Sequence, residues 1–132
     1  TAMAHLKAGD HVVCSRSVFG ATIQLFSSIL GRFGITTSYV DLSDNKAWQA
    51  AVQPNTRMFY LETPSNPLTE IADIRAIAKI ANKANADLFI CIHANAGSSA
   101  AYGTETYVLG LHRTEAQQRV MERENSIIAL ID

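Results

Sequence analysis

Residues 11–40 read HVVCSRSVFGATIQLFSSILGRFGITTSYV, and this stretch decides the fold class. Its first five residues, 11–15, form a compact run rich in β-branched side chains, which is typical of a strand. Residues 18–33 then repeat apolar side chains at helical spacing, and Gly34 supplies a glycine of the kind that often ends a helix. Residues 36–40 form a second strand-like run. The stretch therefore predicts a strand, a helix and a second strand in succession.

The same alternation extends on both sides of this stretch. Residues 1–8 have the pattern of a helix that ends at Gly9. Ser43 or Asp44 is expected to cap a short helix, and Asp73 is expected to cap a longer one. Further strands are expected at residues 57–61, 88–92 and 104–109. The chain is thus predicted to form a single α/β domain with an open, mostly parallel sheet of about five strands, helices on both faces and a Rossmann-like βαβαβ order.

Composition and charge argue against several classes of protein. Of the 132 residues, 48% are hydrophobic and 17% are charged, which is typical of a folded globular domain. The net charge of −1 gives no reason to expect a nucleic acid or an anionic membrane as a partner. Cys14 and Cys91 lie inside apolar runs, so both are expected to be buried thiols and not a disulfide or a metal pair. No apolar run is long enough to span a bilayer and residues 1–8 do not form a signal peptide, so a cytoplasmic location is expected.

Three stretches, which begin at Leu6, Phe33 and Pro54, carry a family resemblance: LKAGDHVVCSRSVFGATIQLF, FGITTSYVDLSD and PNTRMFYLETPSNPLTEIADI. They resemble the cystathionine gamma-synthase family of PLP-dependent sulfur amino-acid enzymes, and the ETPSNP segment at residues 62–67 is the most specific part. The resemblance implies that Phe19 falls where an aromatic ring stacks on the cofactor. It also implies that Asn66 falls where an asparagine contacts the hydroxyl side of the pyridine ring.

The same resemblance shows which parts of a PLP site do not match. The family needs a lysine that holds the cofactor and an aspartate against its pyridine nitrogen. The strand that would carry the aspartate reads LFICIHAN at residues 88–95, without an acidic side chain. The family's lysine lies further downstream and its Ser-Gly-Met phosphate loop would precede Thr1. Phe19 and Asn66 are therefore expected to be vestigial PLP positions.

From about Ile80 the chain resembles a second family. The stretches IANKANADLFICIHANA and GTETYVLGLHRTEAQQRVMERENSII are similar to the zinc-dependent N-acetylmuramoyl-L-alanine amidases. This resemblance implies that His93 is one zinc ligand, although the other ligands and the catalytic glutamate of that family are not matched. Because catalytic zinc takes about three protein ligands, His93 is expected to be a vestigial metal ligand.

These two resemblances predict a chimera of segments at about residues 1–80 and 80–132, joined between Ala76 and Asp87. Both parent families supply a helix followed by a parallel strand there, so such a join would preserve the local structure. The expectation is a recombined α/β domain without catalytic activity and without a cofactor. The alternative is an enzyme remnant, either a zinc-dependent amidase or a PLP-dependent sulfhydrylase. Homo-oligomerisation is also expected, because missing parental segments would leave apolar surface uncovered.

Overall fold

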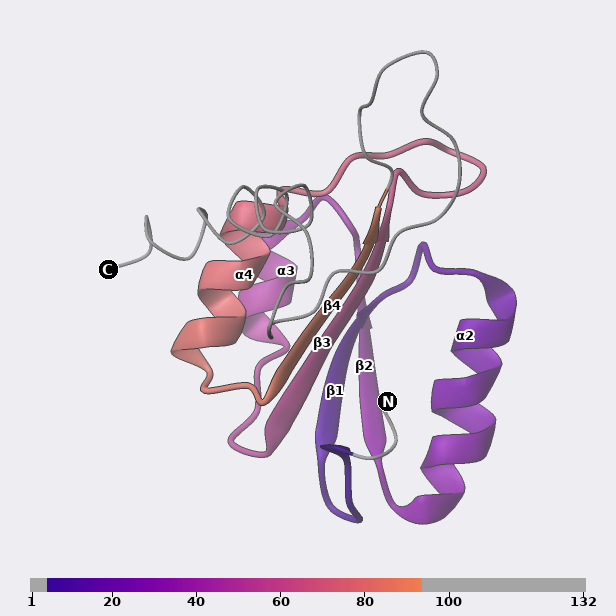
Figure 1. Ribbon diagram of the computed structural model, residues 1–132, viewed down its shortest axis with the longest axis vertical. Helices are drawn as coiled ribbons and strands as arrows, with labels where there is room; N and C mark the ends of the chain where they lie inside the picture. The colour runs from indigo at the N-terminus through magenta and orange to yellow at the C-terminus, as the bar shows by residue number, and fades with distance from the viewer. Residues whose placement is uncertain (1–4, 94–132) are drawn as a thin grey trace, which may run out of the picture. The chain divides into compact units, whose positions relative to one another are not determined.

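The computed structural model describes residues 5–93, and these residues form one sheet with helices on both of its faces (Figure 1). All strand pairs are parallel, and the strand order is β2-β1-β3-β4. The four strands are β1 (His11–Ser15), β2 (Thr36–Val40), β3 (Thr56–Thr63) and β4 (Leu88–His93). This arrangement confirms the predicted parallel α/β fold, and the predicted strand at residues 104–109 lies outside the described residues.

The register of the strands brings all four carboxyl ends to one edge of the sheet, called here the carboxyl edge. Ser15 at the end of β1 pairs with Val40 at the end of β2. Thr63 at the end of β3 pairs with His93 at the end of β4. Since the strands run upward in Figure 1, the carboxyl edge is the upper edge of the sheet in that view.

One face of the sheet is covered by a helical segment that changes its hydrogen-bonding pattern twice. It begins as α2 (Gly20–Gln24), continues as the π-helical η1 (Leu25–Ile29) and ends as the 3₁₀-helical η2 (Leu30–Phe33). Its buried residues Phe26 and Leu30 pack against Val12, Cys14 and Met58 of the sheet. Gly34 ends the segment with φ +74°, a conformation that favours glycine. The single helix predicted over residues 18–33 therefore ends where expected, begins two residues too early and is too uniform in type.

The opposite face carries α3 (Asn45–Ala50) and α4 (Ile74–Lys83) (Figure 1). The Asp44 carboxylate accepts hydrogen bonds from the backbone amides of Lys46 and Ala47, so Asp44 and not Ser43 caps α3. The Asp73 carboxylate accepts from the amide of Ala76 and caps α4 as predicted. These two helices enclose the larger core cluster, whose buried members are Val13, Val40, Leu42, Trp48, Phe59, Leu61, Ala72, Ile77 and Ala81.

The segment before β1 differs from its prediction. In this segment, His5 is the only helical residue among those described. The helix predicted through Ala8 is therefore wrong for residues 6–8. Those residues lead into a tight turn, because the Asp10 carboxylate accepts from the Lys7 amide at 2.9 Å and the Asp10 amide donates to the Lys7 carbonyl at 3.0 Å. Gly9 has φ +91° in this turn, in keeping with a glycine at that position. Across residues 5–93, the helices are all too short or too polar to cross a membrane.

Candidate functional site

The strand order places a topological switch point between β1 and β3. The chain after β1 crosses the face covered by α2, whereas the chain after β3 crosses the face covered by α4. In open α/β sheets, ligands bind beyond the carboxyl ends of strands that diverge in this way. The loops that follow β1 and β3 meet there, since the Ser17 hydroxyl donates to the Glu70 carboxylate at 3.2 Å. The carboxyl edge between β1 and β3 is therefore the candidate functional site.

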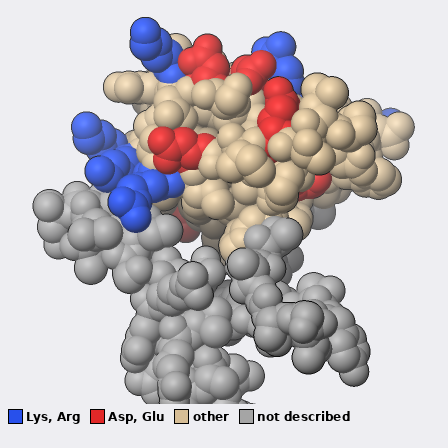
Figure 2. Space-filling view, turned by 90° about the horizontal axis from the view of Figure 1, so that it is seen from above, with Lys and Arg blue, Asp and Glu red and all other residues tan. Residues whose placement is uncertain are grey.

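Carboxylates are spread over this edge, and Figure 2 looks down on its described surface. Three of them satisfy the exposed amides at the start of a helix: Asp44 serves α3, Asp73 serves α4 and Glu62 serves α2. A negative charge at a helix N-terminus is favourable, because the first amides of a helix lack internal partners and the helix dipole is positive there. These acidic side chains therefore hold the scaffold of the edge in place.

Phe19 lies at the start of α2 and turns its ring to solvent. It is the N-cap residue of that helix, with φ −57° and ψ 141°, and it has no side-chain oxygen that could cap the helix. The Phe19 side chain is 68% exposed, although large aromatic side chains dominate cores. Its backbone is nevertheless fixed, because the Phe19 amide donates to Glu62 Oε2 at 3.0 Å. The predicted stacking residue thus presents a free aromatic face at the switch point.

Glu62, at the end of β3, connects three groups at this position. Its Oε1 accepts from the Thr22 hydroxyl and from the Tyr60 hydroxyl, each at 3.3 Å, in addition to the Phe19 amide on Oε2. Burial and the nearby Glu62 charge raise the pKa of the Tyr60 hydroxyl, which favours its protonated, donating form. A carboxylate of the chain itself thus satisfies the N–H of the residue that begins α2.

Asn66 lies on the loop between β3 and α4, and this loop is braced from within. The Ser65 hydroxyl accepts from the Glu70 amide at 3.0 Å, and the Glu70 carbonyl accepts from the Ser65 amide at 2.9 Å. The Thr63 hydroxyl accepts from the Ala72 amide at 3.0 Å. Asn66 is exposed on this braced segment, between the cis peptide bonds Thr63–Pro64 and Asn66–Pro67. The Ser17–Glu70 bond joins this loop to the one that carries Phe19.

His93, the predicted vestigial zinc ligand, ends β4 at the same edge and is exposed. Within residues 5–93, no three His, Cys, Asp or Glu side chains gather closely enough to hold a metal ion. His11 is at the opposite end of the sheet, so it does not join His93. Among residues 5–93 the structure therefore assembles no cluster of metal-binding side chains around His93.

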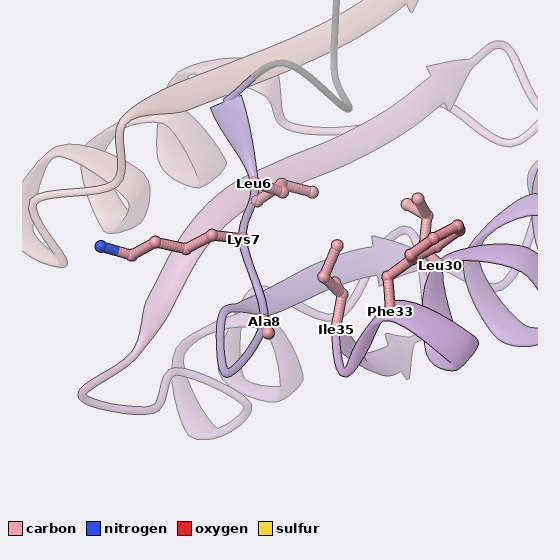
Figure 3. Close-up of a pocket in the computed structure, with 6 residues that line it drawn as sticks. All are labelled: Leu6, Lys7, Ala8, Leu30, Phe33 and Ile35. Atoms are coloured by element: carbon pink, nitrogen blue, oxygen red, sulfur yellow. The ribbon is translucent and has the colours of Figure 1, made fainter.

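A separate hollow of about 360 Å³ lies at the amino end of the sheet, beside the start of β1 and β2. Most of the residues that line it are apolar, namely Leu6, Ala8, Leu30, Phe33 and Ile35, and Lys7 is the remaining one. Figure 3 shows the Lys7 amine extending away from the apolar side chains. No charged group is thus directed into the hollow by the residues drawn there, and the hollow lies at the opposite end of the strands from Phe19.

Cys14 is buried beside the site and should be chemically inert. Burial, with a further contribution from the Glu62 charge, raises the pKa of its thiol to about 12. Since the thiolate is the reactive form, we expect iodoacetamide at pH 8 to leave Cys14 unmodified in the folded chain and to modify it after unfolding in urea. Peptide mass spectrometry separates Cys14 from Cys91. Rapid modification of Cys14 in the folded chain would contradict its burial between α2 and the sheet.

Comparison with known proteins identifies the family. The family profile described as Cys/Met metabolism PLP-dependent enzyme matches residues 1–103. The chain belongs to this family. O-succinylhomoserine sulfhydrylase of Pseudomonas aeruginosa is 52% identical over 88 residues, which are 67% of this chain and 22% of that protein. Cystathionine gamma-lyase of Rattus norvegicus is 43% identical over 84 residues, or 63% of this chain and 21% of the relative.

Solved structures of the Cys/Met metabolism family show the same fold. The crystal structure of cystathionine gamma-lyase from Lactobacillus plantarum, complexed with L-serine, aligns with a TM-score of 0.62 at 42% identity. The alignment covers 74% of this chain and 25% of that chain. The present chain therefore spans about a fifth to a quarter of the length of these family members.

The extent of the family match corrects the predicted splice. The match runs to residue 103, through the whole interval between Ala76 and Asp87 where a join was expected. In the structure, the strand after this interval belongs to the same sheet, because β4 pairs with β3 over six consecutive residue pairs, from Met58↔Leu88 to Thr63↔His93. The prediction of a recombined domain without catalytic function, half of it derived from an amidase, is therefore wrong. The alternative reading as a segment of a PLP-dependent sulfhydrylase is the one that these findings favour.

The matching family is PLP-dependent, which does not support the expectation that no cofactor is involved. The described residues can be compared with what a PLP site requires. The exposed ring of Phe19, on a backbone held by Glu62, fits the stacking side of a planar cofactor. β4 ends in His93, so this strand does not supply the aspartate that the family resemblance implies. Residues 5–93 thus fit one side of a PLP site, formed by Phe19 and the loop of Asn66.

Proposed function

We propose that this chain forms the cofactor-facing part of a PLP-dependent enzyme of sulfur amino-acid metabolism. The relatives that support this proposal are a homoserine sulfhydrylase and cystathionine lyases, which belong to the same family. The observation that carries the proposal is the 68% exposed ring of Phe19, held at the switch point of the parallel sheet. The large aromatic side chains of Trp48, Phe26 and Phe59 are buried in the core, whereas the Phe19 ring is exposed and its backbone is held. Such a ring is suited to stacking on a planar ligand.

The described side chains would divide the work of binding between them. Phe19 would stack on the pyridine ring and keep water from one of its faces. Asn66 would contact the hydroxyl side of that ring from the braced β3–α4 loop. PLP, when bound, supplies an electron sink for chemistry at the carbon atoms of an amino acid. The residues of this chain would orient the pyridine ring. The reaction itself would need groups from further parts of the enzyme.

Replacing Phe19 with alanine is expected to weaken cofactor binding by about threefold to tenfold, which is the typical value of an aromatic stacking contact. The probe is pyridoxamine 5′-phosphate, which lacks the aldehyde and therefore does not condense with surface lysines. Its affinity for the full 132-residue chain and for the variant is measured by titration calorimetry.

Phe33→Ala is the matched control. Phe33 is 60% exposed at the far end of the same helical segment, near the amino end of the sheet. The proposal predicts that this variant binds the probe as the unaltered chain does. Equal losses in both variants, or no binding by the unaltered chain at millimolar probe, would contradict the proposal.

Self-association stays a prediction. Exposed apolar side chains of the carboxyl edge favour it, since Leu68 and Ile71 are 71% and 67% exposed on the β3–α4 loop. Light scattering at high protein concentration gives the mass of the particle, and a clean monomer would contradict it.

A further inference from the structure

We propose that Glu62 is a positioning residue for the stacking ring of Phe19, acting through the backbone at the start of α2. This inference rests on the proposed function, because Phe19 must be the stacking residue for its position to matter. It assigns to Glu62 a role in orienting a side chain 43 residues away in the sequence, and no contact between Glu62 and the cofactor is needed.

The first step of the argument is the missing cap of α2. A helix leaves its first amides without internal partners, and a Ser, Thr, Asp or Asn at the N-cap usually supplies an oxygen. α2 has Phe19 at that position and no side-chain cap of its own. Its neighbours on the other face of the sheet, α3 and α4, are both capped by a local aspartate. α2 is therefore the helix of these three that depends on an oxygen from elsewhere in the chain.

Glu62, near the end of β3, supplies an oxygen to the N-cap residue of α2 and not to the amides of its first turn. Its Oε2 accepts the N–H of the N-cap residue itself, which is the bond that a glutamate makes in a capping box. In a capping box the glutamate lies three residues into the same helix, whereas Glu62 reaches α2 from a neighbouring strand. The bond consequently fixes the start of α2 relative to the sheet. It also fixes the direction in which the Phe19 side chain leaves the backbone.

The carboxylate is itself held in position from two further directions. The Thr22 hydroxyl of α2 and the Tyr60 hydroxyl of β3 both donate to Oε1. The Tyr60 ring is in turn packed edge-on against Phe26, with 5.4 Å between the ring centroids. A side chain with both oxygens engaged has little freedom to move. Glu62 therefore holds the Phe19 backbone in a fixed position relative to the sheet.

Hydrogen exchange at the Phe19 amide gives a direct test that requires no cofactor. Glu62→Ala removes the acceptor, so we expect the Phe19 amide to exchange at least about tenfold faster than in the unaltered chain. Asp44→Ala is the matched control, since it also removes a helix-capping carboxylate from the carboxyl edge but lies on the other face of the sheet. It is expected to leave exchange at Phe19 unchanged. Unchanged exchange in Glu62→Ala would overturn the positioning role.

A double-mutant cycle tests whether this positioning matters for binding. Glu62→Ala is expected to weaken pyridoxamine 5′-phosphate binding by a factor close to that of Phe19→Ala. The double variant should bind no more weakly than Phe19→Ala alone, because Glu62 acts only through the ring. If the losses of affinity in the two single variants multiply in the double variant, the inference is overturned, because Glu62 would then act independently of Phe19.

Glu62→Met keeps the test decisive if Glu62→Ala does not fold. The methionine side chain has a similar length and no carboxylate oxygen, so it cannot replace the bonds that Glu62 accepts from the Phe19 amide and from the two hydroxyls. Faster exchange at Phe19 with a folded circular dichroism spectrum would support the inference, and unaltered exchange together with unaltered binding would overturn it. If the unaltered chain fails to bind the probe, the proposed function fails, whereas the exchange measurement still reports on Glu62.

Discussion

Replacing Trp48 with alanine is expected to lower the free energy of unfolding by about 3–5 kcal/mol, the usual cost of removing a large aromatic side chain from a core. Trp48 is fully buried between α3 and the sheet. Its ring stacks on Phe59 of β3, with 6.1 Å between the ring centroids and 21° between the planes. Its indole N–H donates to the Leu42 carbonyl at 3.2 Å, so the substitution removes packing and leaves a buried carbonyl without that donor.

Urea unfolding followed by far-ultraviolet circular dichroism measures this loss. Fluorescence is unsuitable, because Trp48 is the one tryptophan in the chain. Trp48→Phe serves as the comparison, since it keeps an aromatic ring against Phe59 and removes only the N–H and part of the volume. We expect its loss to be smaller, about 1–3 kcal/mol. A loss below about 1 kcal/mol for Trp48→Ala would contradict the central place of this residue in the core.

The second large effect is expected at His11, a fully buried histidine at the amino end of the sheet. Its ring connects the three strands β1, β2 and β3. Nδ1 lies 2.8 Å from the Thr56 hydroxyl, and Nε2 lies 2.9 Å from the Ser38 hydroxyl. His11→Leu would leave both hydroxyls without the ring as partner, so we expect a loss of about 2–4 kcal/mol in the free energy of unfolding at pH 7.5.

The contribution of His11 should also depend on pH. Burial lowers the pKa of the His11 imidazole below its ordinary value of 6.5, because the charged form is poorly solvated inside the protein. Between the lowered pKa and 6.5, the unfolded chain therefore binds more protons at this residue than the folded chain does. Stability from the neutral His11 is fully present above pH 6.5 and is lost as the pH falls below it.

Unfolding curves at pH 7.5, 6.5 and 5.5 test this dependence. The difference in stability between the unaltered chain and His11→Leu should be largest at pH 7.5 and should narrow as the pH falls. His11→Gln, which retains hydrogen-bonding capacity and does not titrate, controls for the lost contacts with Ser38 and Thr56. A difference that stays constant or widens towards pH 5.5 would show that the folded chain does not disfavour the protonated imidazole.

Much of the fold could be predicted from local sequence pattern. The runs at residues 11–15 and 36–40 coincide with β1 and β2, because β-branched side chains between glycine and polar turns have few alternatives to a strand. β3 runs to Thr63, two residues beyond its prediction, because Glu62 and Thr63 pair with β4. The π-helical turn in η1 was not predictable, since apolar spacing does not specify which carbonyl each amide selects. Strand order was left open by the sequence, as it depends on packing of distant segments.

The candidate site was predictable only in part. The three stretches that resemble the family, with ETPSNP as the most specific part, pointed to Phe19 and Asn66, whose loops the structure brings to one edge. The bond between Glu62 and the Phe19 amide was missed, because it joins two loops through the register of β1 and β3. No local signal pointed to it, because Ser17 directly precedes the helix predicted over residues 18–33 and is itself a residue type that can cap a helix. The splice was wrongly inferred because helix-to-strand steps at residues 76–92 look alike in unrelated α/β proteins.

The strand order β2-β1-β3-β4 bears on how the chain can fold as it is synthesised. β2 adds to one side of β1, β3 then adds to the other side, and β4 adds to β3. Every new strand joins an open side of a sheet that already exists, and none has to be inserted between two strands that are already paired. The sheet formed by these residues can therefore grow in the order in which the ribosome delivers them, without breaking backbone hydrogen bonds made earlier.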